Sequence, residues 1–351
     1  MAIGYGDGIP GTAGAGVGTG VGEATRRGQG WWLGLVGAAT LVLVGLCLAE
    51  AGSGPSDRVL RLIGSVAAVP GVLAVSQLLL LRSKRIEPAT IGVAGLGAAI
   101  VGVNATDNGG LLSGLLLALL AAVPFAFLSG FLSMNAHTGH ALFSAVAVLI
   151  GADQLVDDIS PDTLRIVRAS WLNSLDHNGL RIPGVLLAGV AVFLLVAWYL
   201  PRQERWLGAP APGWLRVTVL LFLPAFLLAV VAGVLFTARI GATTPGGLSR
   251  EFMIVCLLGL TAGGCSLRSG EGTVLDVAVG ALFAGALQTL LHLKAVGFST
   301  QSTIMCGVAV AFIFADLARL RRTPISAPPL PPVPPVLPTQ PPPPADTPYA
   351  R

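Results

Sequence analysis

Ten long hydrophobic segments divide the chain, and they constrain its fold more than any other feature. A membrane-spanning helix needs about 20 apolar residues, because each residue adds about 1.5 Å and the hydrocarbon core is about 30 Å thick. Most of the segments reach this length, and they lie at 31–50, 60–81, 89–105, 110–134, 139–155, 183–200, 214–237, 250–266, 273–293 and 300–318. A transmembrane β-barrel would instead alternate apolar and polar residues. The pattern predicts an all-α, polytopic transmembrane helical bundle with about ten hydrophobic segments.

The composition excludes the soluble classes of protein. The chain is 54% hydrophobic and only 11% charged, with a mean hydropathy of +0.79. A soluble domain is about 25% charged, so a globule of this composition lacks the polar residues needed to cover its surface. This excludes a soluble enzyme, a nucleic-acid-binding domain and a secreted disulfide scaffold. We expect the lipid bilayer, and no nucleic acid, as a partner.

Three regions follow from the distribution of glycine, proline and apolar residues. Residues 1–30 are rich in glycine and lack apolar periodicity, which predicts a disordered cytoplasmic tail. Residues 323–351 are rich in proline and predict a second disordered tail of polyproline II character. The transmembrane domain occupies 31–322.

The charges predict the orientation. With ten crossings and the N-terminus inside, more than half of the 21 lysines and arginines fall on the cytoplasmic side, which favours an N-in, C-in topology. Three segments, 89–105, 139–155 and 250–266, are short or broken. Such segments are typical of transporters, in which irregular backbone lines a cavity.

The sequence contains no recognisable catalytic or metal-binding motif. It has no HExxH, no GxSxG and no GxxxxGK[ST] pattern. His137 and His140 are three residues apart and share a helix face, as metal ligands do, but no acidic residue or cysteine lies nearby. We expect no catalytic residues, no metal and no cofactor.

One motif near the C-terminal end carries a family resemblance. It has the form GG-x-S-L-x-G-G-x-G and consists of Gly263, Gly264, Ser266, Leu267, Gly270 and Gly272, with Ser269 at a position that is usually glycine. Together with its flanks at 223–252 and 273–322, it resembles the permease subunits of bacterial ABC importers for monosaccharides, of the ribose, xylose and galactose type. The chain resembles a diverged member of this family.

A second stretch, 68–97, resembles the same family with substitutions. Ala74 and Gln77 match, and Ile86–Glu87 stand for an Ile-Asp pair, but Lys84 and Arg85 replace two glycines. A cation at the bilayer centre costs about 2.5–3.5 kcal/mol on insertion scales. We therefore expect the two cations at the cytoplasmic interface or paired with Glu87.

The resemblance implies a transport role in the bacterial plasma membrane. It implies a second permease chain, identical or different, a separate ABC ATPase subunit and an extracytoplasmic solute-binding protein, so that this chain is not itself an enzyme. A sugar needs hydrogen-bonding groups in an otherwise apolar wall. The substrate-path candidates are Gln77, Glu87, Ser266 and Gln288. For each of them, a polar residue satisfied by a neighbouring helix is an equally good reading.

The connection at 201–216 departs from the family. It lacks the Gly-Gly-Asn-x-x-Ala-Ala-x-x-Ser-Gly pattern and is short, which leaves Arg202, Gln203, Glu204, Arg205 and Trp206 as candidates for contact with the ATPase. ATP hydrolysis drives transport only if such a contact shifts the inward–outward equilibrium. Two functions stay open: an importer permease, and a non-transporting scaffold derived from one that has lost ATPase coupling. A membrane enzyme is the least favoured class.

Overall fold

The computed structural model describes residues 19–322, with gaps at 53–55, 82, 84–85, 107–109, 136–137, 161–164, 167–182, 208–212, 244–247 and 267–269. The tails predicted at 1–30 and 323–351 lie outside this range, apart from 19–30. Those residues form the beginning of helix α1 (Thr19–Glu50), so helical structure extends into the segment assigned to the first tail.

Ten helical segments follow one another in the described ranges, and each coincides with one of the predicted hydrophobic segments. They are α1, α2 (Ser56–Leu81), α3 (Ala89–Thr106), α4 (Leu111–Asn135), α5 (Thr138–Ile159), α7 (Gly184–Leu207), a continuous helix made of α8 (Trp214–Val217), the π-helical turn η1 (Thr218–Phe222) and α9 (Leu223–Ile240), then α10 (Leu248–Ala262), α11 (Val274–Leu293) and α12 (Phe298–Arg322). Seven are long and apolar enough to cross a membrane, and α3 and α10 are shorter apolar helices. The predicted all-α, multi-pass class is confirmed.

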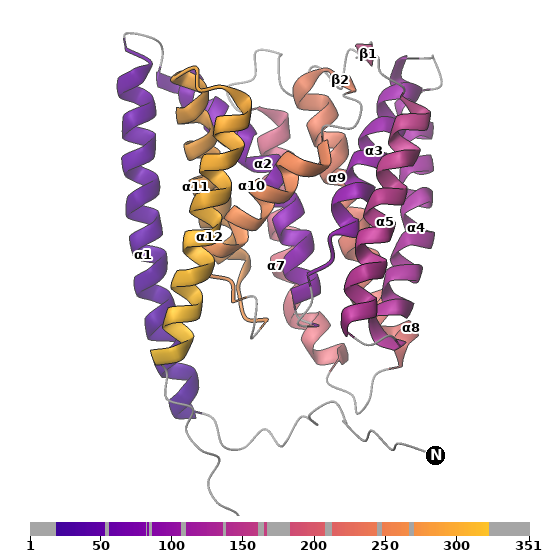
Figure 1. The fold of residues 1–351 in the computed structure, drawn as a ribbon, viewed down its shortest axis with the longest axis horizontal. Helices are drawn as coiled ribbons and strands as arrows, with labels where there is room; N and C mark the ends of the chain where they lie inside the picture. Colours follow the sequence, from indigo (N-terminus) through magenta and orange to yellow (C-terminus); the bar gives the residue numbers. More distant parts are fainter. Residues whose placement is uncertain are drawn as a thin grey trace, which may run out of the picture.

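The ends of the bundle agree with the predicted topology. The beginning of α1 and the end of α12 lie at the same end of the molecule, together with the end of α7 and the beginning of α8 (Figure 1). The opposite end carries two strands of two residues each, β1 (Arg165–Ile166) and β2 (Ala242–Thr243), which pair antiparallel. An even number of crossings therefore brings both ends of the bundle to the side that the charges predict to be cytoplasmic.

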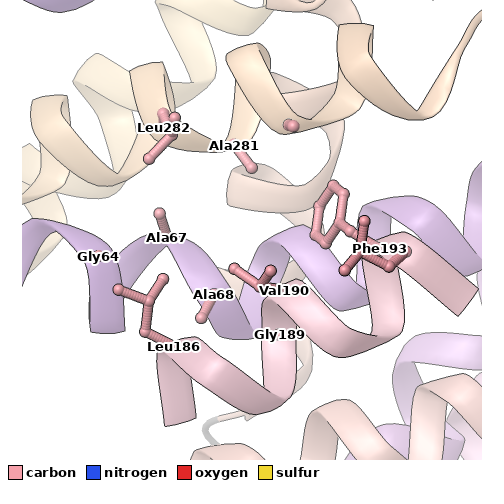
Figure 2. Close-up of a pocket in the computed structure, with 11 residues that line it drawn as sticks. Gly64, Ala67, Ala68, Leu186, Gly189, Val190, Phe193, Ala281 and Leu282 are labelled. Carbon is pink, nitrogen blue, oxygen red and sulfur yellow. The ribbon is translucent and has the colours of Figure 1, made fainter. Parts of the chain in front are cut away.

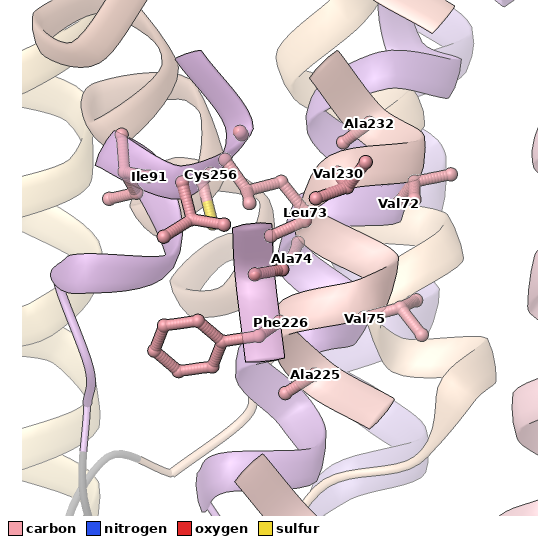
Figure 3. Close-up of a cluster of buried hydrophobic side chains, with 14 of the residues drawn as sticks. Val72, Leu73, Ala74, Val75, Ile91, Ala225, Phe226, Val230, Ala232 and Cys256 are labelled. Atoms are coloured by element: carbon pink, nitrogen blue, oxygen red, sulfur yellow. The ribbon is translucent and has the colours of Figure 1, made fainter. Parts of the chain in front are cut away.

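Helix α2 forms the centre of the bundle. Every residue from Ile63 to Leu81 is buried, as expected for a helix that is apolar on all sides. Helices α7, α9, α10 and α11 all pack against it. Figure 3 shows Leu73 of α2 among side chains such as Phe226 of α9 and Cys256 of α10. The helices around α2 are exposed on their outer faces, where large apolar side chains meet the lipid.

The pattern of contacts between helices is the same in the two halves of the chain, and the corresponding helices of the two halves run in opposite directions. Helix α3 packs on α4 and α5, and α10 packs in the same way on α11 and α12. Helix α2 packs on α11, and its counterpart α9 packs on α4. The second set of helices starts from the opposite end of the bundle, because five segments precede it. This is the arrangement of an inverted-topology repeat, which is common in membrane transporters.

Candidate functional site

The side-chain amide of Gln77 bonds to the chain between α2 and α3. We call this connection, from the end of α2 at Leu81 to the start of α3 at Ala89, the break. The Nε2 atom of Gln77 donates to the Glu87 carbonyl at 2.8 Å, and its Oε1 atom accepts from the Glu87 backbone N–H at 3.2 Å. Gln77 Nε2 also donates to the hydroxyl of Thr90, which itself donates to the Glu87 carbonyl at 2.9 Å. The three residues are at most 3% exposed. These bonds therefore satisfy backbone groups that water does not reach.

The residues just before Glu87 include the two cations singled out in the sequence. Lys84 and Arg85 lie outside the described residues, so their position near the interface or beside Glu87 stays a prediction. The described neighbour Ser83 continues the end of α2, because its N–H and its hydroxyl both donate to the Leu80 carbonyl, at 2.9 and 2.6 Å. The chain then turns through Pro88 into α3, which begins at Ala89.

The glycine motif forms the turn that ends α10. The N–H of Cys265 donates to the Leu260 carbonyl at 3.1 Å, and the N–H of Gly264 donates to the Thr261 carbonyl at 3.0 Å. Gly264 has φ +83°, so these two bonds form a Schellman C-cap, which requires a left-handed residue at this place. The turn then closes on itself, because the N–H of Ser266 donates to the Glu271 carbonyl at 2.9 Å. Ser266 is buried, and Leu267 lies outside the described residues.

This turn packs against α2 beside Gln77. A Cβ atom placed on Gly272 would lie 2.7 Å from Cys265 Sγ and 3.1 Å from Cδ1 of Leu78, the residue that follows Gln77. The structure therefore places the end of the motif that contains Ser266 against Leu78, the neighbour of Gln77 in α2.

Two further contacts hold the turn in place. The side chain of Asp276 accepts from the Thr273 backbone N–H at 2.6 Å, and the Thr273 hydroxyl accepts from the Asp276 N–H at 3.2 Å. This capping box begins α11 directly after the motif. On the other side, the indole N–H of Trp32 in α1 donates to the Ala262 carbonyl at 3.0 Å. The motif is thus anchored by helices from both ends of the chain.

Gln288 lies apart from the other path candidates. It is near the end of α11 and lines a small crevice of about 10 Å³ with Gln301 and Ser302 of α12. The amide of Gln301 donates to the Val296 carbonyl at 2.7 Å, which ties the beginning of α12 to the preceding turn. A crevice of this size holds at most one water molecule. Gln288 therefore belongs to a different level of the bundle from Gln77, Glu87 and Ser266.

The candidates for contact with an ATPase lie on the last turn and a half of α7. Helix α7 continues through Pro201 to Leu207, so 202–206 are helical. The Arg202 guanidinium lies 3.7 Å from the centroid of the Trp198 ring. Gln203 is fully buried and donates to the Leu220 carbonyl at 2.8 Å, whereas Trp206 is exposed. The side chains of Glu204 and Arg205 lie outside the described residues.

A crevice of about 240 Å³ opens on the outer surface, where α7 and α11 diverge over α2 (Figure 2). Gly64, Ala67 and Ala68 of α2 form its floor, and Phe193 and Leu282 flank it. All of its lining side chains are apolar or glycine, and exposed neighbours such as Leu194 face the lipid. A polar solute would lose its hydrogen bonds there without replacement. This crevice is therefore unsuited to a sugar.

Known proteins similar to this chain include permeases of import systems. The chain is 25% identical over 254 residues to the autoinducer 2 import system permease protein LsrC of Photorhabdus luminescens, which covers 65% of this chain and 72% of that protein. It is 27% identical over 289 residues to the LsrC protein of Enterobacter sp. (strain 638), which covers 73% of this chain and 78% of that protein. No protein-family model matches the chain.

The chain is similar to permeases of bacterial import systems. This confirms the resemblance stated from the glycine motif and from 68–97. With its seven long apolar helices, the relationship places the chain among multi-pass proteins of the bacterial plasma membrane. The names of these similar proteins describe them as permease proteins of import systems.

Several residues of this region escaped the sequence analysis. Thr90, Trp32 and Tyr199 each make a hydrogen bond that fixes a break or turn, but none belongs to a recognisable motif. Trp32 is 230 positions away from its partner Ala262, and no pattern in the sequence joins them. The contact made by Tyr199 had one signal in the sequence, which is Pro224. A proline within an apolar segment predicts an irregular helix and a carbonyl without its helical donor four residues earlier, here that of Leu220.

Proposed function

We propose that the chain is the transmembrane permease subunit of an ABC-type importer for a small polar solute. A monosaccharide is the first candidate, and the solute moves by alternating access. The similarity to autoinducer 2 import permeases over about three quarters of their length carries this proposal. It is favoured over the scaffold because the proteins that match the chain are named as permeases of import systems.

The arrangement of the two breaks supports a path for the solute. Irregular backbone at membrane depth is tolerated where it is enclosed by protein or lines a cavity. Here Gly272 of the turn that contains Ser266 packs against Leu78, and the neighbouring Gln77 is hydrogen-bonded to Glu87. In this proposal, Glu87 and Ser266 offer hydrogen bonds to the solute, and Gln77 holds the break in shape. Gln288 would meet the solute at another level of the path.

The proposal includes the partners that the family resemblance implies. A second permease chain would form the other wall of the path, and a separate ATPase subunit would supply the energy. An extracytoplasmic binding protein would deliver the solute. Arg202, Glu204, Arg205 and Trp206 at the end of α7 are the proposed contacts with the ATPase, because α7 ends at the same end of the bundle as the beginning of α1 and the end of α12.

Purification of the tagged chain tests the partners directly. The chain is extracted in mild detergent, and the proteins that co-purify are identified by mass spectrometry. We expect an ABC ATPase in stoichiometric amount. Recovery of the chain alone, from cells in which a known permease keeps its ATPase, would overturn the coupled importer and favour the scaffold.

Uptake measurements test the solute. The complex is reconstituted in proteoliposomes with ATP, and uptake of radiolabelled monosaccharides and of autoinducer 2 is compared. Glu87→Gln is expected to lower uptake at least tenfold while leaving the purified complex intact. The control is Glu50→Gln, at the opposite end of the bundle, where Glu50 forms an exposed ion pair with Lys294. Equal uptake by both variants would remove Glu87 from the path.

A further inference from the structure

The helix from Trp214 to Ile240 contains an irregular turn that exposes a carbonyl. In η1 the N–H of Leu223 donates to the carbonyl of Thr218, five residues earlier, instead of four. Pro224 follows immediately and has no N–H group. The Leu220 carbonyl therefore lacks the donor that an α-helix would supply. In a membrane segment, a carbonyl in this position needs another partner.

Two side chains of α7 supply that partner. The Tyr199 hydroxyl donates to the Leu220 carbonyl at 2.9 Å, and Gln203 Nε2 donates to the same atom at 2.8 Å. Tyr199 and Gln203 are four residues apart, so they share one face of the helix. Gln203 is fully buried. We call this pair of donors, with the Leu220 carbonyl, the carbonyl latch.

The part of the helix before the latch is fixed to a different neighbour. A Cβ atom on Gly130 of α4 would lie 2.2 Å from Thr218 Oγ1, so α4 and η1 are in close contact. The rings of Phe131 and Trp214 pack edge to face with their centroids 5.4 Å apart. Helix α8 and the first residue of η1 therefore pack on α4, whereas the Leu220 carbonyl within η1 is bonded to α7.

The part of the helix after the latch is fixed to α3. A Cβ atom on Gly233 would lie 2.0 Å from the Ala94 carbonyl oxygen, so the two backbones touch. The Thr237 hydroxyl donates to the Ala98 carbonyl at 3.3 Å. Helix α3 begins at Ala89, directly after the break at Glu87. A displacement of α9 therefore carries α3 and the break with it.

We propose that Tyr199 and Gln203 are positioning residues that transmit movement of the end of α7 into α9 and α3. This rests on the proposed function, because the movement is the one that an ATPase imposes on the end of α7. The latch bonds the end of α7 to η1, which is the joint between α8 and α9. With the latch formed, the joint follows α7. Without it, the joint keeps its packing on α4 but loses its link to α7, and ATP hydrolysis no longer moves the break.

The test separates this mechanical role from the need to satisfy a carbonyl. The double variant Tyr199→Phe/Gln203→Leu removes both donors. Adding Pro224→Ala returns an N–H to the position four residues after Leu220, so the carbonyl regains an intrahelical partner while its link to α7 stays broken. Leu195→Ala, at an exposed position one turn before Tyr199, is the control.

The quantity to measure is solute transported per ATP hydrolysed, in proteoliposomes that contain the complete complex. We expect the double variant to lower this ratio at least fivefold with the ATPase still bound, and the triple variant to recover thermal stability but not the ratio. An unchanged ratio in the double variant, or full recovery in the triple variant, would overturn the mechanical role. A wild-type complex without uptake would overturn the proposed function instead.

A second measurement tests the joint without transport. Spin labels are placed at the exposed positions Leu215 and Ile240, in a chain whose exposed Cys306 is replaced by serine. The distance distribution between the labels is expected to broaden in the double variant and to narrow again when Pro224→Ala is added. An identical distribution in the wild type and the double variant would show that the latch does not hold the joint.

Discussion

Trp32 of α1 lies directly on Gly264, the left-handed residue of the turn that ends α10. A Cβ atom on Gly264 would lie 2.6 Å from Cδ1 of the indole ring, and the ring N–H donates to the Ala262 carbonyl at 3.0 Å. The same ring packs edge to face on Phe312 of α12, with centroids 5.7 Å apart. The first and last helices of the chain thus meet at the family motif.

This contact predicts that Gly264→Ala strongly destabilises the protein. The left-handed conformation alone costs a residue with a Cβ atom about 1–2 kcal/mol, and the clash with Trp32 adds to this cost. The free energy of unfolding is measured in mixed micelles by titration with sodium dodecyl sulfate. Gly45→Ala is the control, because a Cβ atom there meets nothing within 4 Å. Equal stabilities for the two variants would contradict the contact.

The buried amide of Gln77 gives a second prediction. Gln77→Leu leaves the Glu87 N–H without its acceptor in a region that water does not reach, which costs about 1–3 kcal/mol. We expect lower stability and at least a tenfold loss of solute uptake, because the break that carries Glu87 loses its shape.

The adjacent residue provides the matched control for Gln77. Ser76 is also buried, but its hydroxyl donates at 2.7 Å to Leu73 within its own helix. Ser76→Ala is therefore expected to keep uptake within twofold of the wild type. A similar loss in both variants would mean that any polar change in this part of α2 disturbs the bundle, and Gln77 would have no special part in the break.

The sequence predicted the segments better than the connections between them. Each of the ten apolar runs forms a helix, because in lipid an apolar run can satisfy its backbone only in this way. The pairing of Gln77 with Glu87 was hidden, since it depends on how ten residues fold back on themselves. The separation of Gln288 from Ser266 was hidden for a related reason: the order of residues along α11 does not reveal which neighbours each face meets.

The crossing of α10 and α11 leads to a third prediction. A Cβ atom on Gly280 would lie 1.8 Å from the Gly259 carbonyl oxygen, so no side chain fits without moving a helix. Close helix contacts at small residues are a main source of stability in membrane bundles, since lipid competes with larger apolar side chains.

We therefore expect Gly280→Ala to lower the thermal midpoint by several degrees and to reduce the yield of monodisperse protein. The measurement is size-exclusion chromatography after heating in detergent. Gly307→Ala in α12 is the matched helical control, because that position is open. If both variants retained the wild-type midpoint, the close approach of α10 and α11 would not exist in the membrane.

Ala295 yields a prediction in the opposite direction. It follows α11 with φ +50°, and the N–H of Val296 donates to the Leu291 carbonyl at 3.1 Å, so the helix ends in a Schellman turn with alanine in the left-handed position. Glycine adopts this conformation without strain. Ala295→Gly should raise the free energy of unfolding by about 1 kcal/mol. Ala38→Gly, at an exposed position within α1, should lower it by about the same amount, because glycine weakens a helix interior. Opposite signs for the two variants in the same detergent titration would establish the turn, and a loss of stability in both would show that residue 295 is not left-handed.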